Sequence, residues 1–596
     1  MKNIRFEFNC NREVPFYGHL CNQYLHSEQF DLCIGQQGNL YFIEAQGKQT
    51  ELENLADTIA SDFLLSTSLE QPQIRAVENL TGTKTLLPPS ALDLEYCQHC
   101  QPKFADNQSA NFGDVNYPCQ CCNAHLRLPA SLNEIKLQEI KNLVRQLEER
   151  GKLTIEHNGI EQHISFKPIT KDNTEQRACL MICNPNNLNA HFSVTNQQVL
   201  ALSSIEKPRI TARPIAKHPR LEQALYEICF AKSRLLLVIC EILRQKGIDF
   251  IYVENSDNPQ MVQINGQWVR LNAAVTNSIH RYPAHREALH DNAQQYAYDS
   301  MRKVSCLANC KNHVIEVKVE HDSQQPDPNL IQQQSQDAAA CALHASCIKQ
   351  KKPKHKAVIY FSDKFNNQIL TLDEKQNTDL FFEFPVLPNN GYEIVHQLEL
   401  SPQKALIEKF KQQFPEDYIN LLSLKLTSPT NNVQSLWAIA SIFLGAVTAK
   451  QNINALSKQQ LSDYIIAKGM CHKGANAPRI DFPLTRGEAF RSLNWCKTLG
   501  SIISFRLAEA DNIEKLAFGM HDSLADFICN WIEHLDQNIS IKTVLLSGSG
   551  FANELLGQRL SLRLGKNFLL ECNPEQDLEG VNLAVGALYL KRRRHA

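Results

Sequence analysis

The chain has 596 residues, which is too long for a single hydrophobic core and predicts about three to five domains. A hydrophobic fraction of 43% and a charged fraction of 21% exclude an intrinsically disordered chain. The formal net charge of −2 argues against a dedicated nucleic-acid-binding protein. No run approaches the roughly 20 apolar residues that span a bilayer, and the first residues carry no signal-peptide pattern. We therefore expect a cytoplasmic protein without membrane contact, whose 20 cysteines are reduced thiols or metal ligands.

The first part of the chain predicts a small α+β unit, then a cysteine-rich segment, then a mixed α/β region. Apolar runs with turn residues between them predict strands within 4–8 and 30–44, and the next periodic segment predicts a helix over 52–64. A capping-box pattern at 131–134 predicts the start of an amphipathic helix that ends before Gly151.

The second half of the chain predicts a different architecture. Residues 321–356 are rich in Gln, Asp and Lys and predict a linker with one short helix. From residue 357 onwards strands alternate with long helices, and the chain ends in strand–turn–helix units such as KTVLLSGSG followed by ANELLGQRL. This alternation predicts an α/β domain.

Four cysteines have the spacing of a structural zinc site. Cys97 and Cys100 form one C-x2-C pair, and Cys119 and Cys122 form a second pair after eighteen residues. Two such pairs supply four thiolates to a tetrahedral zinc ion. The polar intervening loop cannot build a core of its own, so zinc would supply its folding energy, of order 10 kcal/mol. Cys121 remains an alternative ligand in place of Cys119 or Cys122.

Two further clusters combine cysteine with histidine at short spacing. They could form a second metal or iron–sulfur site. One of them lies in the apolar helical run AAACALHASC, where packing of small residues explains the cysteines equally well. The residues of the two clusters are Cys306, Cys310 and His313, and Cys341, His344 and Cys347.

Short segments in a shared order resemble the HypF family. PPSALDLEYCQHC and YPCQCC are similar to the first zinc finger of that family. Nearer the C-terminus, LSGSGFANELL, MHDSL and EGVNLAVGAL are similar to its L-S-G-G-V-F-Q-N-x-L-L, F-H-N-x-L and D-G-G-L-A-L-G-Q segments. The chain resembles a divergent and shortened member of this family.

HypF proteins are carbamoyltransferases of [NiFe]-hydrogenase maturation, and the resemblance implies a multidomain α/β and α+β fold. The implied parts, in chain order, are a degenerate acylphosphatase-like α+β unit (1–89), a zinc finger (90–130), a degenerate YrdC-like α/β domain (131–320), the linker (321–356), and a shortened C-terminal ASKHA-type α/β domain of the universal tRNA-threonylcarbamoyltransferase type (357–596).

The first domains depart from the family at positions that carry its chemistry. Tyr17 stands where the acylphosphatase motif has the arginine that holds phosphoryl oxygens, and Gln36 stands at the asparagine that orients water. A phenol cannot replace a bidentate guanidinium. In the YrdC-like region, Lys171 and Arg177 are the only cations left in the segment that binds nucleotide phosphates in the family.

The C-terminal domain departs further. Phe414 replaces a metal-binding histidine, and only twelve residues separate Tyr418 from Thr430, where the family has its H-H-H-A-H and D-G-T-G segments. Glu579 replaces the late aspartate and is a candidate residual metal ligand. A strand–turn–helix unit could still present amides to a phosphate or nucleotide. The residues of that turn are Ser547, Gly548, Ser549 and Gly550.

The family resemblance implies a first function and the departures imply a second. The first is carbamoyl transfer that uses carbamoyl phosphate and ATP, with zinc as structural cofactor, to a cysteine of a hydrogenase maturation protein. The second is a catalytically inactive paralogue that acts as scaffold or adaptor and binds a maturation protein or a hydrogenase subunit. RNA binding through the YrdC-like fold is disfavoured by the near-neutral charge.

Overall fold

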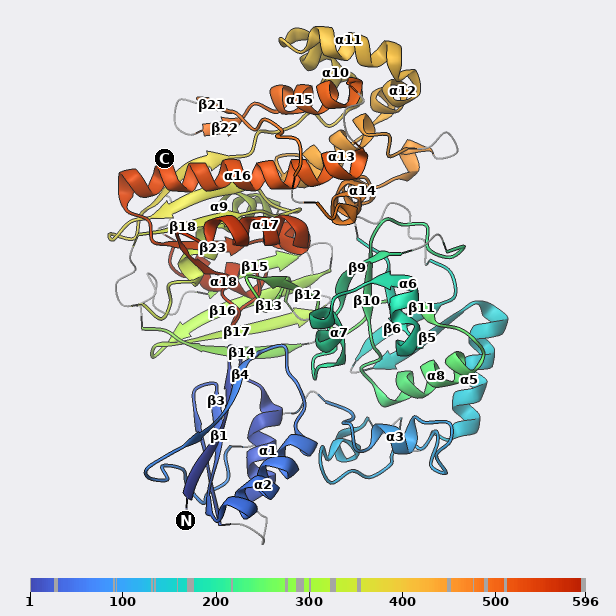
Figure 1. Cartoon of the computed structure of the whole chain (residues 1–596), viewed down its shortest axis with the longest axis vertical. Helices are drawn as coiled ribbons and strands as arrows, with labels where there is room; N and C mark the ends of the chain where they lie inside the picture. Colours follow the sequence, from blue (N-terminus) through green and yellow to red (C-terminus); the bar gives the residue numbers. More distant parts are fainter. Residues whose placement is uncertain are drawn as a thin grey trace. The chain divides into compact units, whose positions relative to one another are not determined.

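A computed structural model of the chain describes residues 2–25, 31–88, 92, 94–129, 132, 135–157, 159–168, 176–215, 218–273, 277–285, 294–299, 302–321, 328–350, 355–447, 452–474, 476–486, 491–508 and 512–590. The chain divides into two compact units, whose elements are labelled in Figure 1. Unit 1 comprises Met1–Ile169, Ala178–Leu221 and Tyr226–Gln260. Unit 2 comprises Thr170–Arg177, Glu222–Leu225 and Met261–Ala596.

Unit 1 begins with a four-stranded antiparallel sheet in the order β2-β3-β1-β4. Phe6 and Phe8 lie two residues apart on β1 and so share a face, where both are buried in one core with Phe16 and Leu20 of helix α1. The elements of this part are β1 (Lys2–Cys10), α1 (Pro15–Leu25), β2 (Leu32–Gln37), β3 (Leu40–Gly47), α2 (Gln49–Asp62) and β4 (Leu69–Ala76).

The cysteine-rich segment follows, and its regular elements are short. They are α3 (Gln101–Phe104) and the 3-10 helix η1 (Ala124–Arg127). The predicted capping box at 131–134 falls largely outside the described residues, and the helix itself, α5 (Leu137–Arg150), begins later. It ends as predicted at Gly151, whose φ of +71° suits glycine and whose amide donates to the Leu147 carbonyl at 2.8 Å.

The remainder of unit 1 is a seven-stranded mixed sheet in the order β5-β6-β11-β7-β10-β9-β8. Helices α5 and α8 pack against each other beside it (Figure 1). The strands are β5 (Lys152–His157), β6 (Ile160–Ser165), β7 (Cys179–Ile182), β8 (Phe192–Ser193), β9 (Ile210–Pro214), β10 (Tyr226–Cys229) and β11 (Phe250–Glu254), and the helices are η2 (Pro185–Asn187), α6 (Leu188–His191), α7 (Asn196–Ser203) and α8 (Arg234–Gln245).

The long segment of unit 2, Met261–Ala596, begins with a hairpin and a four-stranded antiparallel sheet in the order β14-β17-β16-β15. Asn265 and Gly266 both have positive φ in the hairpin turn, which is the preference of a type I′ turn. The elements are β12 (Met261–Ile264), β13 (Gln267–Arg270), β14 (Ser278–Pro283), β15 (Gln294–Asp299), β16 (Val304–Lys311), β17 (Val314–His321) and α9 (Pro328–Ala345).

These elements differ from the predicted boundaries. Residues 261–320, assigned from sequence to the YrdC-like domain, belong to unit 2 because Val304 and Val317 share a core with α9 and α18. The predicted linker, 321–356, contains α9 rather than one short helix. Helix α18 approaches α9 so closely that a Cβ at Gly586 would lie 1.8 Å from the Cys341 carbonyl oxygen.

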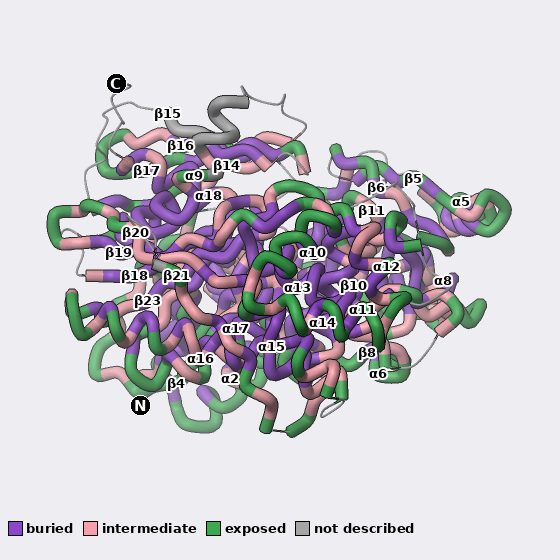
Figure 2. The backbone as a smooth tube through the Cα atoms, turned by 90° about the horizontal axis from the view of Figure 1, so that it is seen from above, coloured by how far each residue is buried: buried purple, intermediate pink, exposed green. Residues whose placement is uncertain are grey.

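A second seven-stranded sheet, in the order β21-β22-β20-β19-β18-β23-β24, completes unit 2. Strands β18, β23 and β24 are parallel, as is typical of α/β sheets, whereas β19 is antiparallel to both of its neighbours, β18 and β20. Helix α13 is buried along its full length (Figure 2). The strands are β18 (Lys356–Tyr360), β19 (Gln368–Leu372), β20 (Thr378–Glu383), β21 (Leu484–Arg486), β22 (Arg491–Leu493), β23 (Thr543–Ser547) and β24 (Leu569–Glu571).

The helices of unit 2 that follow β20 are α10 (Gly391–Leu400), α11 (Lys404–Gln413), α12 (Pro415–Ser423), α13 (Val433–Phe443), η3 (Ile453–Ala455), α14 (Lys458–Cys471), α15 (Trp495–Leu507), α16 (Ile513–Ile539), η4 (Ser549–Ala552), α17 (Glu554–Leu564) and α18 (Val581–Ala587). Within the described part of the chain, no helix combines the length and the apolar character that crossing a bilayer requires.

Candidate metal centre and carboxylate site

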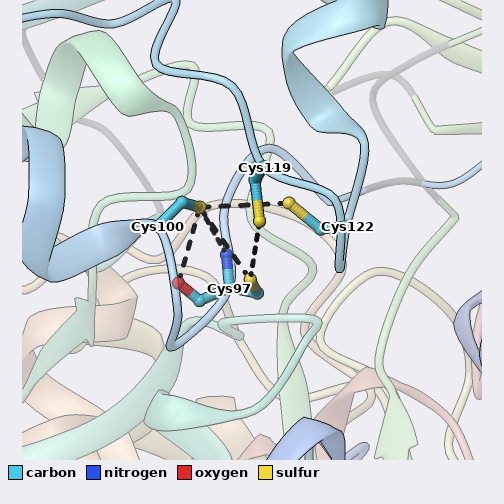
Figure 3. Close-up of side chains that lie close together, drawn as sticks. All are labelled: Cys97, Cys100, Cys119 and Cys122. Carbon is cyan, nitrogen blue, oxygen red and sulfur yellow. Dashed lines mark hydrogen bonds between the residues drawn. The ribbon is translucent and has the colours of Figure 1, made fainter.

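The four predicted cysteines come together in unit 1 (Figure 3). Their Sγ atoms lie within 4.8 Å of one another. The separations are 3.9 Å for Cys97–Cys100, 3.6 Å for Cys97–Cys119 and 3.9 Å for Cys100–Cys122. Zn–S bonds of about 2.3 Å in a tetrahedron place the sulfur atoms about 3.8 Å apart. The group could therefore hold a zinc ion with little rearrangement.

The local backbone fits a metal knuckle at each cysteine pair. The Cys97 amide donates to Cys100 Sγ at 3.3 Å, and the segment then turns into α3. Asn123, directly after Cys122, has a φ of +48°, a conformation that asparagine adopts more readily than most residues. All four cysteines are between 0% and 7% exposed. Water is thereby kept from the thiols, which suits a structural site.

Arg234, at the start of α8, holds the segment that carries the four cysteines (97–122, the cysteine loop) in place. Its guanidinium donates to the carbonyl oxygens of Val115 and Tyr117 at 2.9 and 2.8 Å, and its Nη2 lies 3.7 Å from Cys100 Sγ. The side chain is fully buried and stacks on Phe104. A zinc ion with four thiolates carries a net charge of −2, which this cation partly offsets.

A second contact joins the cysteine loop to the seven-stranded sheet of unit 1. Glu95 accepts the amide of Arg234 at 2.9 Å through Oε2, and its Oε1 binds the imidazole of His157 at the end of β5. Burial alone would lower the pKa of His157, but the hydrogen bonds and charges of Asp257 and Glu95 raise it to about 9. The imidazolium is therefore part of a buried charge network at neutral pH.

The predicted acylphosphatase positions carry no phosphate-binding chemistry. Tyr17 is fully buried, stacks on Phe8 and Phe63, and donates its hydroxyl to the Leu64 carbonyl at 3.0 Å. Gln36 is exposed on β2 and its amide donates to the Gly38 carbonyl at 3.0 Å. Tyr17 therefore packs in the hydrophobic core of unit 1.

The predicted nucleotide cation Arg177 has a different role. It lies in a segment that belongs to unit 2, and it forms a bidentate pair with Asp463 of α14. Its Nε lies 2.9 Å from Oδ2 and its Nη2 lies 2.7 Å from Oδ1, with both side chains 5% exposed. Lys171 lies outside the described residues. The guanidinium is committed to a carboxylate rather than to a phosphate.

The turn of SGSG, predicted to offer amides to phosphate, uses them internally. The Gly548 amide donates to the Leu578 carbonyl at 3.2 Å, the Gly550 amide to the Phe361 carbonyl at 2.9 Å, and the Ser549 amide to Glu579 Oε2 at 3.0 Å. The hydroxyl of Ser547 donates to the same Leu578 carbonyl at 2.8 Å. An anion at this turn would have to displace protein acceptors, Glu579 among them.

Glu579 is buried at the N-terminal side of α18. Its Oε2 also accepts the Tyr360 hydroxyl at 3.1 Å, whereas its Oε1 lies 3.8 Å from Lys364 Nζ. Glu579 belongs to none of the His, Cys, Asp and Glu groups that could hold a metal among the described residues. The predicted residual metal ligand thus lies in a hydrogen-bonded position without the partner ligands that a metal site needs.

Sequence reasoning missed the charged residues around Glu579. Lys364 Nζ pairs with Asp299 at 2.6 Å, and both line a small cavity that Glu579 also borders. Asp363, on a second small cavity, has its pKa raised to about 6 by burial and by the charge of Glu579. The segment that carries Asp363 and Lys364, FSDKFNNQ (361–368), is only faintly similar to the family segment G-A-E-L-K-N-T-F, so little in the sequence indicated this site.

His521 and Phe414, in two segments similar to the family, serve the core of unit 2. His521 is fully buried, with Nδ1 at 2.8 Å from the Ala517 carbonyl oxygen. The indole N–H of Trp437 donates to its Nε2 at 3.1 Å, so Nδ1 carries the proton. Burial lowers the pKa of His521 to about 4. Phe414 packs on Phe410, with 5.3 Å between ring centroids.

The remaining cysteine–histidine clusters are not brought together as a metal site among the residues that the structure describes. Cys121 lies outside the group of four and belongs to a separate group with Asp62 and His99. This arrangement favours Cys119 and Cys122 as the ligands, although the Cys121 thiol also lies close to the Cys97 thiol. The two clusters predicted as a possible second site are Cys306, Cys310 and His313, and Cys341, His344 and Cys347.

Comparison with known proteins gives matches in sequence and in structure. Residues 446–577 match HypF_C_2, the second subdomain of the Kae1-like domain of carbamoyltransferases. Full-length HypF in a phosphate- and nucleotide-bound form is similar over 98% of this chain and 97% of that one, with a TM-score of 0.56 and 10% identity. HypF of T. kodakarensis is similar over 99% and 98%, with a TM-score of 0.56 and 11% identity.

Protein HydE of Wolinella succinogenes is 25% identical over 377 residues. The aligned region covers 61% of this chain and 59% of HydE, so the match spans less than two thirds of that relative.

Proposed function

We infer the function from the chain's place in the HypF family, since it has the HypF fold over its whole length and its residues 446–577 belong to the second Kae1-like subdomain of HypF carbamoyltransferases. The predicted resemblance and the predicted multidomain α/β and α+β fold are thereby confirmed. We propose that the chain acts in [NiFe]-hydrogenase maturation without catalysing carbamoyl transfer. In this role it is a scaffold or adaptor that binds a maturation protein or a hydrogenase subunit.

The observation that carries this proposal is the use of the amides in the SGSG turn. A phosphate cradle needs free N–H donors at a strand-to-helix turn, and here Gly548, Ser549 and Gly550 donate to acceptors of the protein itself. The acceptor of the Ser549 amide is a carboxylate, which repels an anion as well as occupying the donor. The buried Tyr17 and the Arg177–Asp463 pair support the same conclusion at two other predicted sites.

The proposed cofactor of this scaffold is a structural zinc ion bound by Cys97, Cys100, Cys119 and Cys122. Four-cysteine sites of this kind contribute folding energy and leave no open position for substrate. Zinc would order the loop against which Arg234 and Glu95 are held. The metal would thus stabilise a binding surface and take no part in a reaction.

One observation favours the rival function, carbamoyl transfer from carbamoyl phosphate and ATP to a partner cysteine. Asp299, Lys364 and Glu579 border one cavity, and Asp363 has a raised pKa beside the next. Charged groups held in cavities with shifted pKa values are typical of active sites, although structural ion pairs also produce them.

An exchange assay decides between the two functions. We expect ATP–pyrophosphate exchange in the presence of carbamoyl phosphate to stay at the background measured without protein. Exchange above that background, or transfer of labelled carbamoyl groups to a maturation protein, would overturn the scaffold. Transfer that is lost in Lys364→Met and kept in Lys404→Met, an exposed lysine on α11, would assign the activity to the charged cavity.

Binding is tested separately with identified partners. The tagged full-length chain should co-purify with a hydrogenase subunit or with the carbamoyl-acceptor maturation protein from cells that produce hydrogenase. The Cys122→Ala variant should lose this binding because the cysteine loop would unfold. If neither class of partner is recovered under conditions in which the wild-type chain is folded, the proposed scaffold function is wrong.

A further inference from the structure

A second group of metal-binding side chains lies next to the four cysteines. Asp62 is the last residue of α2, His99 lies between Cys97 and Cys100, and Cys121 lies between Cys119 and Cys122. We propose that Asp62, His99 and Cys121 form a second site for a divalent cation of the zinc class, which is open to an exogenous fourth ligand. This site shares no residue with the four-cysteine group but adjoins it, since the Cys121 thiol contacts the Cys97 thiol.

The geometry of the three side chains fits such an ion. One ligand atom from each lies within 4.8 Å of the other two, and His99 Nε2 is 2.9 Å from Asp62 Oδ1. Around a tetrahedral zinc, bonds of about 2.0–2.3 Å place neighbouring ligand atoms about 3.3–3.6 Å apart. Binding would therefore require the imidazole and the carboxylate to separate by about 0.5 Å, which side-chain rotation can supply.

Neighbouring residues hold the ligands in place. The Tyr24 hydroxyl donates to Asp62 Oδ2 at 2.7 Å, which leaves Oδ1 directed to His99. The His19 Nε2 atom lies 2.9 Å from the Cys121 carbonyl oxygen and fixes the backbone of the third ligand. Outer hydrogen bonds of this kind orient metal ligands and tune their affinity.

The three residues differ in solvent exposure in a way that suits a metal site open to solvent. Cys121 is 8% exposed, whereas the side chains of Asp62 and His99 are 19% and 41% exposed. A cation can therefore reach the thiol from the side of His99, and a water or another ligand can take the fourth position. The four-cysteine group, by contrast, is buried on all four thiols.

The donor set selects the class of ion. One thiolate and one imidazole exclude Mg²⁺ and Ca²⁺, which bind oxygen ligands. A mixed sulfur, nitrogen and oxygen set suits Zn²⁺, Co²⁺ or Ni²⁺. Without a metal, the same residues would form only an ion pair that joins the end of α2 to the cysteine loop, and this is the alternative that the test must separate.

Metal stoichiometry tests the proposal. The full-length chain, equilibrated with Zn²⁺ and freed of excess ion by gel filtration, is expected to retain two zinc ions per chain by elemental analysis. His99→Asn and Cys121→Ser should each retain one. The matched controls His396→Asn, at an exposed position on α10, and Cys33→Ser, on β2, should retain two.

Cobalt substitution identifies which site is lost. The thiolate-to-Co²⁺ charge-transfer absorption of the four-cysteine site should persist in His99→Asn. The weaker charge-transfer band of the site with one thiolate should disappear. Retention of one zinc by the wild-type chain, or of two by Cys121→Ser, overturns the proposal. Loss of both ions from Cys121→Ser together with retention of two by His99→Asn would instead make Cys121 a ligand of the first site, and would also overturn it.

Discussion

The Ser549 amide donates a 3.0 Å hydrogen bond to Oε2 of Glu579, thirty residues further along the chain. This bond joins the turn after β23 to the start of α18, and the Tyr360 hydroxyl, from the neighbouring strand β18, reinforces it at 3.1 Å. A turn of the kind that binds phosphate in other proteins is thus closed by the protein's own carboxylate. The folded chain gains a rigid strand junction at the position where an anion would have bound.

The SGSG turn is so tightly packed that adding one methyl group at Gly548 should strongly lower the stability of the fold. Gly548 has a φ of +103°, and a Cβ there would lie 2.0 Å from the Phe361 carbonyl oxygen. We expect Gly548→Ala to lower the free energy of unfolding by more than the roughly 1–2 kcal/mol of left-handed strain alone. Gly557→Ala is the matched control, because its Cβ would meet only Phe551 Cδ1 at 3.6 Å in helix α17.

Urea unfolding of both variants checks this. The control should be unchanged or more stable by up to about 1 kcal/mol, since alanine favours helix over glycine. Equal stabilities of the two variants would contradict the geometry described for the turn.

Replacing Asp363 should stabilise the chain at neutral pH. Burial and the charge of Glu579 raise its pKa to about 6 in the folded protein from about 3.8. The folded chain therefore holds the proton of Asp363 more tightly than the unfolded chain does. The stability that this proton contributes is fully present below pH 3.8 and is lost as the pH rises through 6. A difference of about two pH units, at about 1.4 kcal/mol each, sets an upper limit of about 3 kcal/mol for the gain in Asp363→Asn at pH 7.

The unfolding free energies of wild type and Asp363→Asn, measured from pH 4 to pH 8, should separate as the pH rises. A destabilised variant at pH 7 would mean that the carboxylate makes a net favourable interaction there. Asparagine has nearly the same shape, so loss of packing is not expected to obscure the result.

His521 should lower the stability of the chain as the pH falls, whereas Asp363 lowers it as the pH rises. Its pKa is lowered to about 4 by burial, so the folded state binds no proton at a pH where the unfolded chain, with a pKa near 6.5, already does. Stability is complete above pH 6.5 and is lost as the pH falls through 4. The difference of about 2.5 pH units corresponds to about 3 kcal/mol.

The variant His521→Gln isolates this effect, because its amide oxygen can still accept the Trp437 indole N–H. We expect the stability of the wild type, relative to that of the variant, to fall by up to about 3 kcal/mol as the pH falls from 7 to 4. A stability difference independent of pH would contradict the buried neutral histidine.

Arg234 should control the retention of zinc. Arg234→Met leaves the carbonyl oxygens of Val115 and Tyr117 buried without their donor, and each loss costs about 1–3 kcal/mol. We expect a lower melting temperature and a faster release of zinc to a chelator. Arg145→Met, at an exposed position on α5, is the control and should change neither quantity. Equal release rates would show that the guanidinium does not stabilise the cysteine loop.

The sequence predicted those features whose residues are close together in the chain. The four cysteines could be recognised because each pair is separated by two residues and the pairs by eighteen. Gly151 could be recognised as a helix end because a left-handed residue there has a local signature. These features depend on local geometry and do not require knowledge of the tertiary fold.

Features that depend on distant partners could not be predicted. Asp62 meets His99 and Cys121 only after α2 packs beside the cysteine loop. The SGSG pattern indicates a strand-to-helix turn, but nothing local in it indicates that Glu579 accepts its amide. Likewise α9 was read as part of a linker, because its polar first half conceals the buried alanines of its second half.

The path of the chain between the two units has a consequence for how the protein can be divided. Residues 170–177 and 222–225 belong to unit 2, although the sequence on either side of each belongs to unit 1. A cut after residue 260 would leave a C-terminal fragment that carries Asp463 in its interior without the guanidinium of Arg177. Such a fragment should be less stable than the same residues in the intact chain, because the buried carboxylate of Asp463 is left without its partner.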